Sequence, residues 1–389
     1  MKPIPRTFVA RRATGALALA MTLAAGCTVP APVAEPALPP RAAAPTGPAI
    51  QPSGEPAATP GALPREDSKA VESFYRGKTL RIVVGTSPGG GFDLVARLLA
   101  DHLPAYLPGE PTVIVENKPG AGGMLAANLV YNTEPRDGTV ILSFVSSILL
   151  RQLLGQPGVE FDAGQFQWLG ATDQDTSACL ARSDTGVRTL QDTVAGKELV
   201  LGTGGRGNDS YDVPAVLGAE LGARLKLVEG YRGASELQLA TESKEIDGFC
   251  ISFTALLANV PQWLEGNEPF ARVVAIMGDG APDQPSVPGL VPAERLAKTE
   301  ESRQLMRLVN AGQRINKPFA VAPGVPADRV EALRVALARA YADPEFLAKA
   351  EKARIGVRPQ SAQHVSEYID ALLRTPRPLL DRLQSIVEP

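Results

Sequence analysis

The feature that most constrains the fold is a repeated order of short β-branched run, glycine-rich turn and apolar helix that begins at Thr79. Residues 80–84 form such a run, and apolar residues at helical spacing follow the turn after it. The unit recurs at residues 113–115, and a further strand-like run lies at residues 199–201 before another glycine-rich turn. This alternation predicts an α/β fold in which helices flank mainly parallel sheets. Two such series indicate two sheets, with a ligand cleft between two domains.

Further strand-like runs, and helices at the C-terminal end, complete the pattern. The runs lie at residues 140–142, 177–182, 225–228, 246–251 and 273–276. Pro326-Ala327-Asp328 opens a predicted helix that reaches about Tyr341. Asp343 and Pro344 are typical of the N-cap and first position of the next helix.

The N-terminus has the three parts of an export signal. Lys2, Arg6, Arg11 and Arg12 precede an apolar stretch, residues 13–25, that is too short to span a bilayer. The sequence Leu23-Ala24-Ala25-Gly26-Cys27 resembles the lipobox of bacterial lipoproteins. We expect residues 1–26 to be a signal peptide and Cys27 to carry lipid, which predicts a periplasmic, membrane-anchored lipoprotein. The alternative is an ordinary secretory signal cut nearby, with Cys27 incidental.

A proline-rich segment follows. Residues 28–64 contain eleven prolines and ten alanines and almost no large apolar side chains. Such a segment cannot bury enough surface to offset its ordering entropy. We therefore expect residues 27–74 to be a disordered stalk that holds the folded part away from a membrane.

Composition and charge exclude several function classes. The net charge is −3, and removing residues 1–26 takes away four positive charges and leaves −7. An acidic chain without a basic cluster is not expected to bind nucleic acid. With two histidines and three cysteines, we expect no metal site and no cofactor. Membrane attachment would come from the lipid alone.

Two glycine motifs resemble enzyme signatures, but each is followed or interrupted by residues that the enzyme's chemistry or fold does not allow. Residues 85–89, GTSPG, match the G-x-S-x-G nucleophile turn. Pro88 lacks the backbone N–H that this turn uses for its oxyanion hole, and only His364 could complete a triad. Residues 202–207, GTGGRG, match G-x-G-x-x-G, but polar residues 208–212 and Pro214 follow where an apolar helix is expected. An exported enzyme is therefore the least favoured class.

A simpler interpretation covers all three glycine-rich turns, at residues 87–93, 119–123 and 202–210. Each joins a strand to a helix, where free N–H groups and the positive end of the helix dipole favour an anion. Glycine allows an anion to approach the backbone closely. Three such turns in one exported chain favour a carboxylate receptor.

Longer motifs then identify a family resemblance. Residues 88–97, PGGGFDLVAR, resemble the P-G-G-x-x-D-x-x-A-R signature of the periplasmic receptors of tripartite tricarboxylate transporters, the Bug family. Residues 115–123, VENKPGAGG, match its V-x-N-x-P-G-A-G-G, and residues 135–139, PRDGT, match its P-x-D-G-x. Tyr231-Arg232-Gly233 and Ile246-Asp247-Gly248 fit later segments of the family, in the right order.

The resemblance implies a two-lobed, type II-like periplasmic-binding-protein fold of the Venus flytrap kind. Lobe 1 would contain residues 75–171 and 275–389, and lobe 2 residues 172–274. Such a receptor is a monomer without catalysis that holds a small organic acid between its lobes and delivers it to integral membrane transporter subunits. An extracytoplasmic sensor lipoprotein of the same fold is the alternative.

The resemblance also implies the ligand-binding residues. The expected contacts from lobe 1 are Ser87, Gly90, Gly91, Phe92, Asp93, Ser146 and Ser147. Those from lobe 2 are Gly205, Arg206, Gly207 and Asn208. Arg206 and Arg232 are candidates for a bidentate clamp on a carboxylate, with two solvated surface arginines as the alternative.

The cysteines carry one further expectation. If Cys27 holds lipid, Cys179 and Cys250 remain, each in a predicted strand. In the resembled fold both strands belong to the lobe-2 sheet, so a disulfide is expected in an oxidising compartment. Two buried free thiols are the alternative.

Overall fold

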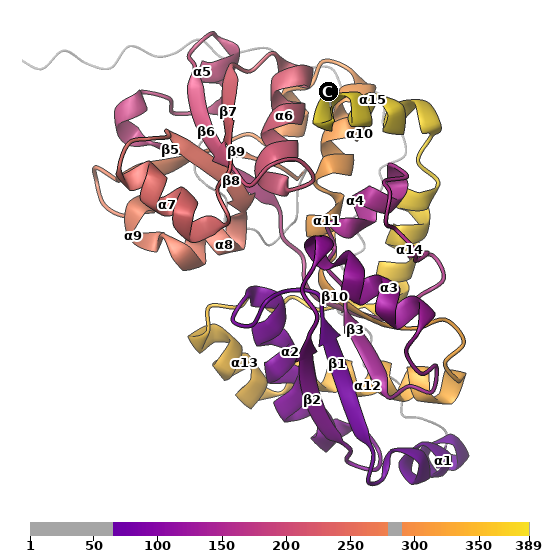
Figure 1. The fold of residues 1–389 in the computed structure, drawn as a ribbon. Coiled ribbons are helices and arrows are strands. Elements are labelled where there is room, and N and C mark those ends of the chain that lie inside the picture. The colour runs from indigo at the N-terminus through magenta and orange to yellow at the C-terminus, as the bar shows by residue number, and fades with distance from the viewer. Residues whose placement is uncertain (1–64, 279–289, 389) are drawn as a thin grey trace, which may run out of the picture. The chain divides into compact units, whose positions relative to one another are not determined.

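The computed structural model describes residues 65–278 and 290–388, which form two β-sheets with helices packed on their faces (Figure 1). The α/β class predicted from the sequence is confirmed. Sheet A has the order β11-β4-β10-β3-β1-β2, and sheet B the order β7-β6-β8-β5-β9. The strands are β1 (Thr79–Val84), β2 (Thr112–Asn117), β3 (Val140–Ser143), β4 (Gln167–Asp173), β5 (Ser177–Arg182), β6 (Leu199–Thr203), β7 (Leu225–Glu229), β8 (Gly248–Ser252), β9 (Ala271–Ile276), β10 (Asn316–Val321) and β11 (Gln360–Ser361).

Both sheets are mixed rather than mainly parallel. The pairs β1–β2, β1–β3, β6–β7 and β6–β8 are parallel, as the strand–helix alternation predicts. The other pairs, β10–β3, β10–β4, β11–β4, β5–β8 and β5–β9, are antiparallel. Strand β10 enters the middle of sheet A only after the chain has completed sheet B, so no strand–helix–strand crossover connects it to its neighbours.

Helices separate most of the strands. They are α1 (Arg65–Tyr75), α2 (Gly91–His102), α3 (Met124–Asn132), α4 (Ile148–Leu153), α5 (Leu190–Val194), α6 (Asp209–Leu221), α7 (Ala234–Glu242), α8 (Phe253–Asn259), α9 (Pro261–Leu264), α10 (Glu300–Val309), α11 (Ala311–Arg314), α12 (Ala327–Ala342), α13 (Pro344–Lys352), α14 (Ala362–Leu373) and α15 (Arg377–Val387). The predicted start of α13 is confirmed, because the Asp343 side chain accepts a hydrogen bond from the Glu345 N–H at 2.7 Å.

The core around sheet B contains helices from the C-terminal end of the chain. Leu305 and Met306 of α10 and Leu383 of α15 belong to the same buried cluster as Leu201 of β6 and Val216 of α6. Figure 1 shows α10 and α15 beside α6. The assignment of all of residues 275–389 to lobe 1 is therefore wrong for these two helices. Their apolar faces pack on sheet B, a long-range contact that chain order does not reveal. The other lobe boundaries remain predictions.

Helix α1 corrects the end of the predicted stalk. Val71 and Tyr75 are fully buried in the core of sheet A, and the Tyr75 hydroxyl donates to the Gly138 carbonyl at 3.0 Å. The Arg329 guanidinium lies over the Phe74 ring, 3.5 Å from its centroid. Apolar residues at helical spacing bury this segment, so residues 65–74 belong to the folded part. The predicted signal peptide, Cys27 and the proline-rich segment to residue 64 lie outside the described residues.

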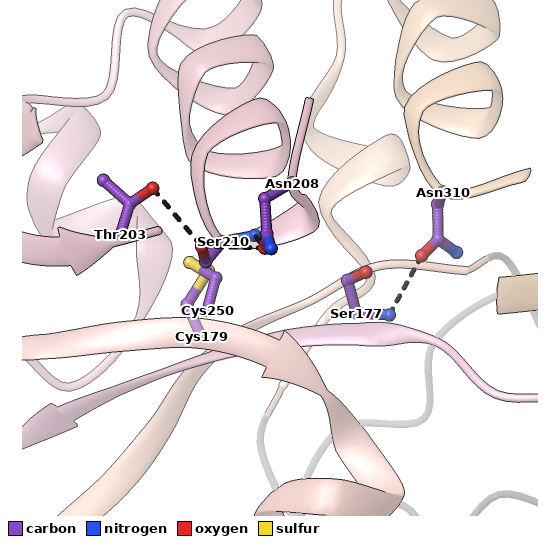
Figure 2. The surroundings of a disulfide bond; sticks show 7 residues. All are labelled: Ser177, Cys179, Thr203, Asn208, Ser210, Cys250 and Asn310. Carbon is purple, nitrogen blue, oxygen red and sulfur yellow. Dashed lines mark hydrogen bonds between the residues drawn. A yellow bond between two sulfur atoms is a disulfide. The ribbon is translucent and has the colours of Figure 1, made fainter. Parts of the chain in front are cut away.

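A disulfide joins two neighbouring strands of sheet B. Cys179 of β5 and Cys250 of β8 are paired residues of an antiparallel ladder, with Cα atoms 4.0 Å apart and Sγ atoms 2.03 Å apart. Both residues are buried. Figure 2 shows the bridge with the polar residues around it, among them Ser210 at the start of α6. The structure thus contains the bridge expected from the sequence.

Candidate functional site

The turn after β1 is held in place by a buried carboxylate. Asp93 Oδ2 accepts hydrogen bonds from the Gly89 N–H and from Arg97 Nε, both at 2.8 Å, and Oδ1 accepts one from Asn117 Nδ2 at 2.9 Å. Burial opposes the charge of this group, but the three hydrogen bonds outweigh it and lower the pKa of Asp93. Since these bonds occupy both oxygens, Asp93 positions the turn rather than contacting a ligand.

The turns after β1, β2 and β3 touch one another where glycine leaves room. A Cβ on Gly85 would lie 2.9 Å from Cα of Gly123, and a Cβ on Gly123 would lie 2.6 Å from a methyl carbon of Val145. Gly123 also has φ +105°, which favours glycine. The three strands are neighbours in sheet A, and β2 and β3 both run parallel to β1. Their turns therefore form one continuous wall at the carboxyl ends of the strands.

The turn after β6 forms the facing wall, and it uses much of its own hydrogen-bonding capacity. The Asn208 side chain caps α6 by accepting a hydrogen bond from the Ser210 N–H at 3.0 Å (Figure 2). Three glycine N–H groups donate to side chains nearby: Gly204 to Ser210 Oγ (3.0 Å), Gly205 to Thr203 Oγ1 (2.9 Å) and Gly207 to Asp212 Oδ1 (3.0 Å). These glycine N–H groups hold the turn and are not free donors for an anion.

Together the turns line an open cleft of about 590 Å³, which is the size of a small-molecule site. From the sheet A side it is lined by Gly85, Thr86, Ser87, Pro119, Gly120, Gly122, Val145, Ser147 and Arg151. From the sheet B side it is lined by Gly204, Arg206, Gly207, Asn208, Asp209, Ser210, Ile251 and Ser252. All three glycine-rich turns singled out in the sequence contribute to this lining.

The structure brings some of the predicted contact residues to this cleft and leaves others outside it. Those that line it are Ser87, Ser147, Arg206, Gly207 and Asn208. Those that do not are Gly90, Gly91, Phe92, Asp93, Ser146, Gly205 and Arg232.

Four of these residues illustrate why they lie outside the lining. Gly90 is the N-cap of α2, and Phe92 packs against the core of sheet A. Ser146 is buried. The Arg232 side chain is 91% exposed and pairs with Glu236 at 3.4 Å, so it does not form a clamp inside the cleft.

Two charged residues of the cleft were missed by the sequence analysis. Arg151 lies on α4, four residues after Ser147, and this spacing places both residues on one face of the helix. The spacing is the signal that could have found it. Asp209 is the first residue of α6, and Gln313 Nε2 donates a hydrogen bond to its Oδ2.

Two acidic groups of α6 on the sheet B side, Asp209 and Asp212, have raised pKa values. Burial raises the pKa of Asp209. Burial also raises the pKa of Asp212 to about 7, although the hydrogen bond from Gly207 and the charge of Arg151 act in the opposite direction. The cleft thus has the cationic side chains of Arg151 and Arg206 in its lining, together with Asp209, whose tendency to ionise is reduced, while Asp212 lies outside the lining.

Neither histidine of the chain lines the cleft. Both histidines lie elsewhere: His102 Nδ1 is 3.0 Å from Asp343 Oδ2, and the His364 ring stacks on Tyr368. Among the described residues that line the cleft there is thus no histidine to activate Ser87. Within residues 65–278 and 290–388 no group of His, Cys, Asp or Glu side chains is placed to hold a metal ion, and no helix is both long and apolar enough to cross a membrane.

Sequence comparison finds a family match across both sheets. The model of the tripartite tricarboxylate transporter family receptor matches residues 95–275. A UPF0065 protein of Bordetella pertussis is 27% identical over 186 residues, which is 46% of this chain and 56% of that protein. A UPF0065 protein of Cupriavidus necator is 43% identical over 68 residues, 18% of this chain and 20% of that protein. The matches to these curated relatives thus span a fifth to little more than half of their length.

Solved structures share the fold. A TctC solute-binding protein from Polaromonas superposes with a TM-score of 0.58 at 18% identity, covering 79% of this chain and 99% of that one. A Rhodopseudomonas palustris protein solved with adipate gives 0.57 at 16% identity over 80% and 97% of the two chains. MatC from Rhodopseudomonas palustris, solved with bound malate, gives 0.54 at 19% identity over 80% and 99%.

Proposed function

We propose that the chain is a receptor of the tripartite tricarboxylate transporter family, whose model matches residues 95–275, and that it captures a small organic acid in the cleft of about 590 Å³. The observation that carries the proposal is the meeting of three glycine-rich turns around this cleft, with Arg151 and Arg206 in its lining. Arginine is suited to carboxylates because its planar guanidinium donates two parallel hydrogen bonds.

The chemistry of the neighbours supports a carboxylate. Two proteins of the same fold were solved with malate and with adipate, which are both small dicarboxylic acids. A volume of about 590 Å³ accommodates molecules of this size. The cleft contacts that we propose from the predicted set are Ser87, Ser147, Arg206, Gly207 and Asn208.

The route of the ligand follows from the family and from the N-terminal sequence. We propose that residues 1–26 are removed on export and that Cys27 is lipidated. The proline-rich segment would then hold a monomeric receptor above the membrane in the periplasm. From there it would deliver its acid to integral membrane transporter subunits. Intact mass of membrane-extracted protein tests the anchor, and an unmodified product that begins elsewhere would contradict it.

A binding screen tests the function. The full chain is titrated by calorimetry and by thermal shift with succinate, malate, adipate, citrate, butyrate and hexanoate. A ligand at a hundred times its Kd adds about 2.7 kcal/mol to the free energy of unfolding. The proposal predicts saturable binding of at least one acid at a stoichiometry of one.

A matched pair of variants locates the binding. Ser87→Trp introduces a bulky neutral side chain into the cleft, whereas Ser385→Trp makes the same change on the exposed surface of α15. We expect Ser87→Trp to abolish binding and Ser385→Trp to bind as wild type. Equal binding by both variants would place the ligand elsewhere.

A further inference from the structure

A second open cavity, of about 500 Å³, lies among the helices of the C-terminal part of the chain. Most of the residues that line it belong to α10, α11, α14 and α15 or to the segments between them. It shares no lining residue with the cleft of about 590 Å³. Its volume is in the range of small-molecule sites, so it is a separate place where a ligand could be held.

The lining of this cavity is cationic, although the whole chain has a net charge of −3. Three of its residues are the arginines Arg307, Arg314 and Arg374. One carboxylate, Glu294, also lines it, which leaves a formal charge of +2. Glu294 is buried, and its Oε1 accepts a hydrogen bond from the Gly278 N–H at 2.7 Å. This carboxylate is therefore already engaged within the protein, and the excess charge of the lining is positive.

Two of the three guanidinium groups have no bonded partner in the part of the chain that the structure describes. Arg307 pairs with Glu300 at 3.0 Å. Within residues 65–278 and 290–388, no side chain or carbonyl accepts a hydrogen bond from the guanidinium of Arg314 or Arg374, and no carboxylate pairs with either group. Arg314 is half-buried and Arg374 is exposed. Because a charge that is partly withdrawn from water is stabilised by an opposite charge, Arg314 is the stronger candidate to bind an anion.

Apolar side chains line the same cavity. Leu308 belongs to the buried core of sheet B, and Leu372 and Leu379 are partly buried and pack against that core. Tyr368 of α14 adds an aromatic ring, with its hydroxyl donating to the Ala311 carbonyl at 3.3 Å. An apolar ligand body that covers the exposed part of these leucines would remove apolar surface from water, which is favourable. The cavity thus combines a cationic and an apolar lining.

We propose that this cavity binds an amphiphilic anion, with its oxyanion head on Arg314 and Arg374 and its apolar chain against the leucines. The head is a carboxylate or a phosphate, because both accept paired N–H···O bonds from a guanidinium. A medium-chain fatty acid and an alkyl phosphate share this chemistry. The proposal does not rest on the proposed function, because the cavity and the cleft have no lining residue in common.

Calorimetry on the full chain tests the ligand class, with Ser87→Trp present throughout so that the cleft is blocked. The probes are octanoate and octyl phosphate. Octan-1-ol keeps the chain without the charge, and acetate keeps the carboxylate without the chain. We expect saturable binding of at least one anionic probe at a stoichiometry of one, and binding of octan-1-ol and acetate that is weaker by at least about tenfold. The probe that binds more tightly identifies the head as carboxylate or phosphate.

Two further substitutions in the same background locate the site. Arg314→Gln should weaken binding of the anionic probe by at least about tenfold. Its control is Arg232→Gln, which removes the same charge from a residue outside the cavity. Ala371→Trp fills the cavity from an exposed position of α14 and should abolish binding. Its control is Ser385→Trp, which makes a change to the same bulky side chain on the exposed surface of α15 and should bind as the background does.

The proposal is overturned if neither anionic probe binds with a Kd below about 1 mM. It is also overturned if octan-1-ol binds as tightly as the anions, since the arginines would then contribute nothing. Unchanged binding by Ala371→Trp would place the ligand elsewhere. A loss in Arg314→Gln no larger than that in Arg232→Gln overturns the role of Arg314. If Arg314→Gln does not fold, Ala371→Trp decides.

Discussion

Reducing the Cys179–Cys250 bridge should strongly destabilise the part of the chain built on sheet B. The two residues are 71 positions apart in the sequence. In the chain-entropy model, closing a loop of that length removes about 15 cal/mol/K from the unfolded state, or about 4 kcal/mol at 25 °C. Both residues are buried in the core shared by sheet B, α6 and α15, so the two free thiols would stay enclosed as small apolar groups. The expected loss in the free energy of unfolding is therefore mainly the entropic amount.

The assay is urea unfolding at pH 7 with and without dithiothreitol, using Cys27→Ala so that no other thiol is present. The matched control is Cys27→Ala combined with Cys179→Ala and Cys250→Ala, which should unfold identically with and without the reductant. It should also be less stable than the reduced protein by about 1 kcal/mol for each buried sulfur removed. The reasoning is refuted if reduction lowers the free energy of unfolding by less than about 1 kcal/mol. Two titratable thiols in the unfolded, unreduced protein would refute it as well.

Three further predictions concern single carboxyl groups. Asp212 should ionise in the folded protein at a pKa of about 7, against an ordinary value of 3.8. Because the buried acid keeps its proton where the unfolded chain has lost it, the free energy of unfolding should fall as pH rises from about 4 to 7 and stay at the lower value above pH 7. Asp212→Asn should therefore raise the free energy of unfolding at pH 8 by up to about 4 kcal/mol and change it little at pH 4, as measured by urea unfolding; an equal effect at both pH values would contradict this. Asp343 shows the opposite sign, because hydrogen bonds from His102, Glu345 and Tyr106 lower its pKa to about 2. The stability it provides is complete above about pH 4 and is lost as pH falls toward 2, so thermal unfolding should show Asp343→Asn below wild type at pH 7 and equal to it near pH 2. Asp93→Ala removes the acceptor of three hydrogen bonds and should cost about 2–3 kcal/mol in urea unfolding while also weakening acid binding in calorimetry; unchanged affinity would show that the turn after β1 keeps its shape without Asp93.

Local sequence patterns determined much of this fold. The short apolar run at residues 80–84 corresponds to β1, and the run at residues 199–201 lies within β6. Asp343 and Pro344 open α13 as their capping chemistry requires. These features depend on residues within a few positions of one another, and such residues are in contact in any fold that contains the element.

Pairings across the chain were decided by the tertiary structure. Strand β10 enters sheet A between β3 and β4, and α15 packs on α6. Neither is a property of a local segment, because an apolar face is equally well buried against any partner of matching shape. Residues 208–212 show the same limit, since their polar character argued against a helix, yet Asn208 caps α6 and Tyr211 and Asp212 are buried in it.

The candidate site also has features that the sequence predicts and features that depend on tertiary contacts. Glycine-rich turns after strands are visible in the sequence, and all three reach the cleft. The roles of individual residues were not visible, because they depend on which partner each side chain meets. Asp93 is occupied by three donors, Arg232 extends into solvent beside Glu236, and Arg151 comes to lie between two glycines that are 85 positions apart in the chain. The sequence alone determined most of the strands, the glycine-rich turns and the family resemblance, but not β4, β10 and β11. Only the tertiary structure decided which charges face the cleft, because burial and electrostatic interaction depend on distances in space.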